Sequence, residues 1–265
     1  MIILGCFFAS CMGVVLGSIG AGGSILLLPI LVYFFEINPV LATSYSLIIV
    51  GLTALLGCYK YLVNKQVNIL VALKFSIPSL IFVYLTRRFF VPLFPDNITF
   101  LNINFSKDSL IMIIFSILMF ISAISVLSFK ERVLSMKKIN LFINNLLLFL
   151  QASLVGFITG IVGAGGGFLI IPVLVIFNKL DMRTAVGTSL LIIFIKSIFG
   201  FIGDFQTGVY IESSLFFIIL FFTCVGMFIG PILFKNFLSD SLKKLFSYFT
   251  LVIAAIILFN EILSI

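Results

Sequence analysis

Long apolar runs are the feature of this sequence that most restricts its fold. Of the 265 residues, 62% are hydrophobic and 9% are charged, whereas soluble globular proteins average about 45–50% and about 25%. A helix needs roughly 20 mostly apolar residues to cross a bilayer, so this length has room for about eight to ten membrane segments and little else. The sequence therefore predicts an all-α polytopic membrane protein without a soluble catalytic domain.

Apolar runs bounded by Gly, Pro, Asn and charged residues predict ten helical segments. Two of them, 24–35 and 167–178, have about twelve residues each, or about 18 Å of helix, which is too short for a hydrocarbon core of about 30 Å. We expect these two to be broken or re-entrant helices. The other segments are approximately 2–17, 40–62, 67–88, 108–128, 144–161, 184–203, 211–235 and 243–263.

A glycine cluster precedes each short segment, and the two clusters reveal an internal repeat. The sequence Gly-Ser-Ile-Gly-Ala-Gly-Gly-Ser at 17–24 returns as Gly-Ile-Val-Gly-Ala-Gly-Gly-Gly at 160–167, which is 143 positions later. The same offset aligns Gly13 with Gly156. Matches of Leu or Phe would mean little in so apolar a chain, but glycine matches at one fixed offset indicate a duplication.

The distribution of charge predicts the boundaries and the orientation of the two halves. Because the densest charge cluster lies between the halves, we predict a first transmembrane repeat at 1–129, a cytoplasmic linker at 130–143 and a second transmembrane repeat at 144–265. If all ten segments are crossings, the connections on one side contain eleven Lys and Arg residues, and those on the other contain Arg87, Arg88 and Lys107. The positive-inside rule then puts both termini outside the cell. This pattern favours an odd number of crossings per half, and hence two inverted repeats of about four to five helical segments each.

The two glycine clusters are the first candidates for a binding site. Glycine lets the backbone leave a helix, and a helix that starts after such a break presents unpaired N–H groups and a positive dipole end, which bind anions. In inverted repeats two such breaks would meet near the membrane midplane. The alternative is that the glycines only let helices pack closely. The candidate anion-binding residues are Gly20, Ala21, Gly22, Gly23 and Ser24 in one copy, and Gly163, Ala164, Gly165, Gly166 and Gly167 in the other.

Three more residues complete the candidate substrate site: Lys196, Ser46 and Ser189. Lys196 lies deep in an apolar segment, where a charge costs at least about 2.5 kcal/mol, and it could contact an anion or reach towards Asp204 and pair with it. The two serines occupy equivalent positions of the repeat, and they could bind an oxyanion or bond back to their own helices. Lys74 is a weaker candidate, because a long side chain there can extend to the membrane interface.

The composition disfavours an intramembrane enzyme. The chain has no His, which is the commonest acid or base near neutral pH and the commonest metal ligand. Its four Cys lie in apolar runs without C-x-x-C spacing, and its nine Asp and Glu fall in connections or near segment ends. We therefore expect no catalytic residue, metal site or cofactor, and we interpret the net charge of +7 as a topology signal rather than as a sign of nucleic-acid binding.

The doubled motif also carries a resemblance to a known family. The pattern G-x-x-G-A-G-G-[SG] is followed five residues later by Pro29 or Pro172 and then by small polar runs at 43–46 and 187–189. Over essentially the whole chain this resembles the sulfite exporter TauE/SafE family of membrane transporters. The resemblance implies a secondary transporter that exports small sulfur-containing anions, such as sulfite or organosulfonates, across a bacterial inner membrane.

Alternating access at the doubled glycine breaks is the mechanism that we expect. An anion channel of the same architecture and a structural membrane protein are the alternatives. The expected partners are a small anionic substrate and the lipid bilayer, and whether the chain forms a homo-oligomer is open.

Overall fold

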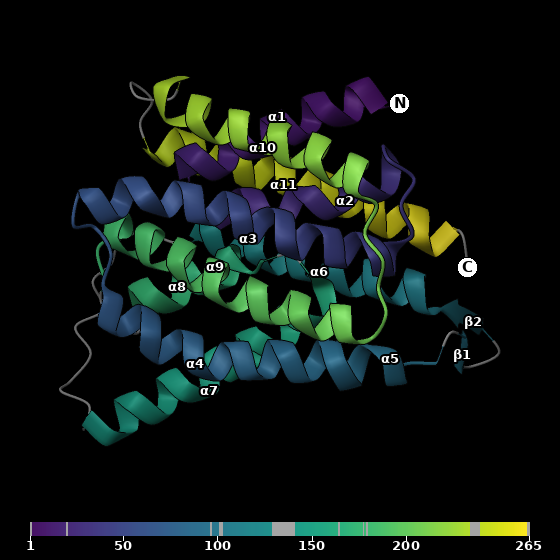
Figure 1. Ribbon diagram of the computed structural model, residues 1–265, viewed down its shortest axis with the longest axis horizontal. Coiled ribbons are helices and arrows are strands. Elements are labelled where there is room, and N and C mark those ends of the chain that lie inside the picture. Colours follow the sequence, from purple (N-terminus) through teal and green to yellow (C-terminus); the bar gives the residue numbers. More distant parts are fainter. Residues whose placement is uncertain are drawn as a thin grey trace.

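The protein is almost entirely helical (Figure 1). The computed structural model describes residues 2–19, 21–95, 97–100, 103–128, 141–163, 165–176, 178, 180–233 and 239–263. The helices are α1 (Ile2–Ile19), α2 (Leu27–Tyr33), α3 (Pro39–Val63), α4 (Ile69–Leu85), α5 (Val91–Leu93), α6 (Lys107–Ser128), α7 (Leu141–Val162), α8 (Gly167–Ile176), α9 (Met182–Gln206), α10 (Ser213–Leu233) and α11 (Ser239–Leu263).

The predicted all-α polytopic membrane fold is confirmed. Each of the ten predicted segments corresponds to helix, and within the described residues six helices are long and apolar enough to cross a membrane. Shorter apolar helices cover Ile3–Ser18, Ser24–Tyr33 and Ser247–Leu263. Helix α7 begins at Leu141, inside the predicted linker at 130–143, and residues 129–140 lie outside the described residues.

Local sequence sets the starts of the long helices. Asn38 precedes α3, where its Oδ1 accepts a hydrogen bond from the Val40 N–H at 3.0 Å, and Pro39 occupies the first helical position. Asn68 caps α4 in the same way, and Asp181 caps α9 through the Thr184 N–H. Such side chains satisfy backbone donors that a helix start leaves unpaired.

Two features differ from the sequence prediction. A short antiparallel hairpin, β1 (Asn97–Phe100) with β2 (Ile103–Ser106), connects α5 to α6, and its four-residue strands are too short to leave a periodic signal. Helix α4 also does not end near residue 88, because it continues through a π-helical turn (Thr86–Phe90) into α5. Arg87, predicted to lie in a connection, is therefore inside the helix.

The helices pair in a pattern that follows the internal repeat. Helices α3 and α9 pack against each other, α1 packs against α10, α4 against α7, and α6 against α11. The repeat offset relates α1 to α7 and α4 to α10, so the α1–α10 contact is the counterpart of the α7–α4 contact. Figure 1 shows α3 and α9 running in opposite directions. Two inverted halves would produce this arrangement.

Figure 1 also places the start of α1 and the end of α11 on the same side of the helix bundle. Both ends of the described chain therefore share one side, as the topology prediction requires. Which side faces the cytoplasm stays a prediction.

Glycines outside the two clusters bring the paired helices close together. A side chain on Gly13 of α1 would overlap the backbone carbonyl of Thr223 on α10. Its repeat counterpart, Gly156 of α7, has the same role, since a Cβ there would lie 2.5 Å from the Ser79 carbonyl oxygen on α4. For this matched pair close helix packing is the correct interpretation.

Candidate functional site

The two glycine clusters lie together in the interior. The first forms a 3-10 turn (Ala21–Leu26) ahead of α2, and this turn contacts both α8 and α9. The second forms the break between α7 and α8, where a Cβ on Gly165 would lie 3.5 Å from Ser24 Cβ and 2.6 Å from Val50 Cγ1. The clusters therefore meet beside α3 and α9. Gly20 and Ala164, two of the predicted site residues, lie outside the described residues.

The second cluster departs fully from helical geometry. Gly163, Gly165 and Gly166 have φ angles of +70°, +63° and +69°, in the left-handed region that residues with a side chain rarely adopt. Close helix packing alone does not require such angles, so the interpretation as a backbone break holds here. The first cluster differs, because residues 21–26 stay in a helical turn.

The start of α8 lies at this break. Leu169 and Ile170 donate the first hydrogen bonds of the helix to the Gly166 carbonyl oxygen, at 3.0 and 3.1 Å. The N–H groups of Gly167 and Phe168 precede these bonds and have no acceptor inside α8. They form the positive end of the helix dipole.

Lys196 points its charge at the same break. It lies just past the middle of the 25-residue α9, its exposed fraction is 0%, and its Nζ is 2.8 Å from the position that a Cβ on Gly166 would occupy. Nζ donates a hydrogen bond to Thr159 Oγ1 at 2.8 Å, and Thr159 in turn donates to the Val155 carbonyl oxygen. The alternative pairing of Lys196 with Asp204 is wrong, because Asp204 pairs with Arg87. Lys74 is exposed on α4.

The two predicted serines differ in how their hydroxyl groups are used. Ser189 Oγ donates to the Val186 carbonyl oxygen at 2.8 Å, which is a bond back to its own helix. Ser46 is fully buried, and its Oγ has no hydrogen-bond partner among the described residues. Thr43 and Val50 both approach the second glycine break, and Ser46 lies between them on the same face of α3. Ser46 is therefore the serine with a free hydroxyl near the break.

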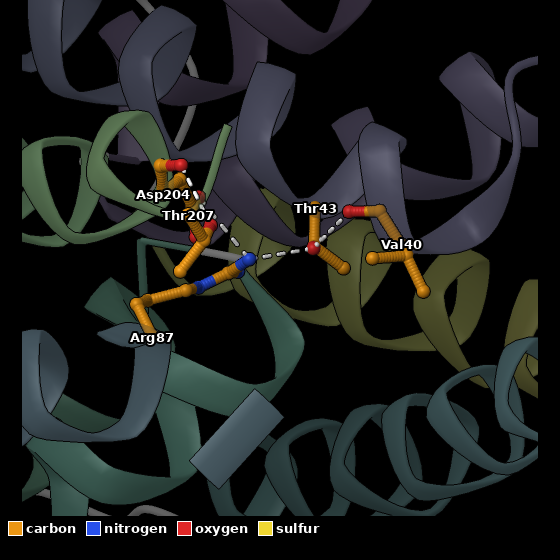
Figure 2. A network of polar contacts seen from close by, with 5 residues as sticks. All are labelled: Val40, Thr43, Arg87, Asp204 and Thr207. Atoms are coloured by element: carbon orange, nitrogen blue, oxygen red, sulfur yellow. Dashed lines mark hydrogen bonds and ion pairs between the residues drawn. The ribbon is translucent and has the colours of Figure 1, made fainter. Parts of the chain in front are cut away.

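A buried ion pair joins this site and was missed in the sequence (Figure 2). The exposed fractions of Arg87 and Asp204 are 1% and 3%, and Arg87 Nη1 lies 3.3 Å from Asp204 Oδ2. The same Nη1 donates to Thr43 Oγ1 at 2.8 Å, and Thr43 donates to the Val40 carbonyl oxygen. Arg87 Nη2 lies 2.6 Å from the position of a Cβ on Gly163, which places the guanidinium against the glycine break.

One sequence signal could have revealed this arginine. The residues after Arg88 are Phe-Phe-Val-Pro-Leu-Phe at 89–94, so the apolar segment resumes beyond the two arginines. The carboxylate that compensates this buried charge comes from a helix distant in the sequence, so it leaves no signal near Arg87.

In the part of the chain that the structure describes, the interior carries more positive than negative charge. Among the described residues, the buried charged side chains are Arg87, Lys196 and Asp204. Asp204 compensates Arg87, whereas the described partner of Lys196 is a neutral hydroxyl. An uncompensated charge in an apolar interior is unfavourable, so this arrangement is suited to an anion. No group of three Cys, Asp or Glu in the described part of the chain is arranged to hold a metal ion.

Comparison with known proteins gives a family and two relatives. The profile of the sulfite exporter TauE/SafE family matches residues 4–257. The probable membrane transporter protein MJ0441 of Methanocaldococcus jannaschii is 28% identical over 194 residues, which cover 71% of this chain and 67% of the relative. The probable membrane transporter protein YunE of Bacillus subtilis is 27% identical over 215 residues, covering 74% of this chain and 75% of the relative. No solved structure matches significantly.

Proposed function

Because this chain belongs to the sulfite exporter TauE/SafE family of membrane proteins, we propose that it is a secondary transporter that exports small sulfur-containing anions, such as sulfite or organosulfonates. The transporter class comes from the family and from the two relatives. The choice of anion, the direction and the mechanism are the proposal.

Lys196 is the observation that carries the choice of an anion. Its ammonium group is fully buried and its described partner is the neutral Thr159 hydroxyl, so an anion would neutralise the charge. The backbone break beside it adds the N-terminal end of α8 at Gly167, and α3 adds the Ser46 hydroxyl, which has no hydrogen-bond partner among the described residues. Donors of these three kinds replace the water that a small oxyanion loses on entry.

Alternating access agrees with the burial of the site. Ser46, Ser189 and Lys196 have exposed fractions of 0%, so an anion bound among them would be closed off from both sides of the membrane. An open channel requires a continuous water-filled path, and these side chains do not line one. Burial therefore favours a carrier that opens to one side at a time.

We place the protein in the bacterial inner membrane with both termini outside, as the distribution of Lys and Arg indicates. An anion that leaves a cell with a negative interior gains about 2.3 kcal/mol per charge per 100 mV. Export of an anion along this gradient needs no proton relay.

Transport by the purified full-length chain in proteoliposomes tests the proposed function. Vesicles loaded with sulfite, sulfate, thiosulfate or methanesulfonate would be compared with empty liposomes for efflux that saturates with concentration. We expect saturable efflux of at least one of these sulfur anions, without single-channel currents. Efflux that matches empty liposomes for all four anions, or stepwise channel currents, would overturn the proposal.

A further inference from the structure

One edge of the Arg87 guanidinium is unused although the residue is buried. Its Nη1 is engaged by Thr43 Oγ1 at 2.8 Å and by Asp204 Oδ2 at 3.3 Å. Its Nε and Nη2 have no hydrogen-bond partner among the described residues, and the exposed fraction of Arg87 is 1%. A buried donor without a partner is destabilising, and here two donors of the same group are left open.

The two open donors form a geometric unit. A guanidinium group is planar, and its Nε and Nη2 hydrogens lie side by side along one edge, where they can bind two oxygens of a single group at once. A carboxylate, a sulfite or a sulfonate offers two such oxygens, whereas a spherical anion such as chloride offers one point of contact. Arg87 therefore presents a fork, while Lys196 presents a point charge.

The glycine break keeps this edge clear. A Cβ on Gly163 would lie 2.6 Å from Nη2, so a side chain there would block it. Gly163 and Gly166 belong to the same break, and Gly166 faces Lys196 Nζ. One short stretch of backbone thus lies against both buried cations.

The opposite side of the guanidinium is fixed by its neighbours. Figure 2 shows Arg87 extending between Asp204 and Thr43. Asp204 offsets the charge of Arg87. Arg87 therefore adds directed hydrogen-bond donors to the site, but no net charge. The net positive charge that attracts an anion remains at Lys196.

We propose that the Nε–Nη2 edge of Arg87 is a second anion contact, and that it selects anions with two oxygens on one atom over spherical anions. This inference rests on the proposed function, since it assigns a specificity-determining residue to the same site. Arg87 then contacts the substrate directly, and Asp204 and Thr43 are positioning residues for it.

Binding by the purified full-length protein tests the role of Arg87. The thermal unfolding midpoint would be followed while sodium chloride is replaced stepwise by sodium methanesulfonate at constant sodium concentration, because a ligand that binds only the folded state raises it. We expect a saturable rise for the wild type. Arg87→Lys keeps the charge but loses the paired Nε and Nη2 donors. Its half-saturating methanesulfonate concentration should rise at least about tenfold.

Arg88→Lys is the matched control. Arg88 is the next residue; it is half-buried, and its Nη1 donates an exposed hydrogen bond to the Gln206 carbonyl oxygen. The half-saturating methanesulfonate concentration of Arg88→Lys should equal that of the wild type. A merely structural Arg87 would behave differently, because Arg87→Lys would then lower the midpoint without ligand and leave the half-saturating concentration unchanged, which would overturn the inference.

The outcomes separate this inference from the proposed function. If the wild type binds methanesulfonate and Lys196→Met weakens that binding while Arg87→Lys does not, the inference is wrong and the proposed function stands. If no sulfur anion is bound or transported by the wild type, the proposed function itself fails. Should Arg87→Lys not fold, the wild type alone decides: stabilisation by methanesulfonate over chloride supports the fork, and equal midpoints in both salts refute it.

Discussion

The Arg87 guanidinium and the Asp204 carboxylate lie 3.3 Å apart in the protein interior and tie the π-helical turn after α4 to the last turn of α9. Both helices also contact the glycine break or its neighbours. The ion pair therefore connects the two halves of the chain beside the candidate site.

Removal of the carboxylate should destabilise the protein strongly. Asp204→Asn leaves Arg87 buried without its counter-charge, and the loss of one partner of a buried pair costs about 3–5 kcal/mol. We expect a clear fall in the thermal unfolding midpoint in detergent. Glu36→Gln is the control, because Glu36 is exposed; similar midpoints for the two variants would show that the pair does not hold the helices together.

The two lysines of the membrane segments should differ in their effect on transport. Lys196→Met removes the buried charge at the glycine break, whereas Lys74→Met removes an exposed charge on α4. In the proteoliposome assay we expect Lys196→Met to lose most of the anion efflux and Lys74→Met to retain it. Equal effects, or the reverse order, would contradict the assignment of Lys196.

A single methyl group at the break should be enough to impair the site. Gly166→Ala places a Cβ 2.8 Å from Lys196 Nζ and against Thr159 Cγ2, in a backbone with φ of +69°. Gly208→Ala is the matched control, because Gly208 also has a positive φ, of +86°, but nothing lies within 4 Å of its Cβ position. In both variants, alanine at a positive φ destabilises the backbone by about 1–2 kcal/mol.

Transport should separate these two glycine variants. We expect Gly166→Ala to lose efflux and Gly208→Ala to keep it, with similar amounts of both proteins in the membrane. If both variants transport normally, the break is not part of the anion path.

The cap of α9 should make stability depend on pH. Two hydrogen bonds from Thr184 hold the pKa of the Asp181 carboxyl below its ordinary value of 3.8. Because the pKa is lower in the folded state, the stabilisation is complete above the unfolded value and is lost as the pH falls through the folded value. Asp181→Ala should cost about 1 kcal/mol at pH 7.

The stability difference between the wild type and Asp181→Ala should shrink below about pH 3.8, as the Asp181 carboxyl of the wild type becomes protonated. Unfolding midpoints of the wild type and of Asp181→Ala over a pH series check this. Asp181→Ser keeps a cap that does not titrate, so its difference from Asp181→Ala should stay constant with pH. If the stability difference between the wild type and Asp181→Ala also stays constant with pH, the Asp181 carboxylate is not the cause of that difference.

Helix positions could be predicted closely where the local sequence decides them. The predicted segment at 184–203 became α9 at Met182–Gln206, because an apolar run and an Asp cap mark it without help from the rest of the chain. The break at Gly163, Gly165 and Gly166 was also predictable, since clustered glycine ahead of a segment too short to span signals departure from a helix.

The burial of Arg87 could not be predicted in this way. A charged residue normally marks the end of an apolar segment, but this rule fails when a carboxylate 117 positions later compensates the charge inside the protein. The unequal geometry of the two glycine clusters could not be predicted either. Both contain Gly-Ala-Gly-Gly, but the second lies against Thr43 and Arg87 at Gly163, and such distant neighbours leave no mark on the local sequence.

The repeat offset gives the charged site no counterpart in the other half. Lys196 corresponds to Thr53, and Arg87 corresponds to Gly230. Thr53 bonds to its own helix through the Ile49 carbonyl oxygen, and Gly230 packs against the backbone of Val14. Each half thus contributes one buried cation, at a position where the other half has a residue that bonds to its own helix or packs against a neighbouring one. In the proposed alternating-access mechanism, an exchange of conformations between the two halves would not regenerate an equivalent molecule, so the inward-facing and outward-facing forms would differ in energy and in their populations at rest.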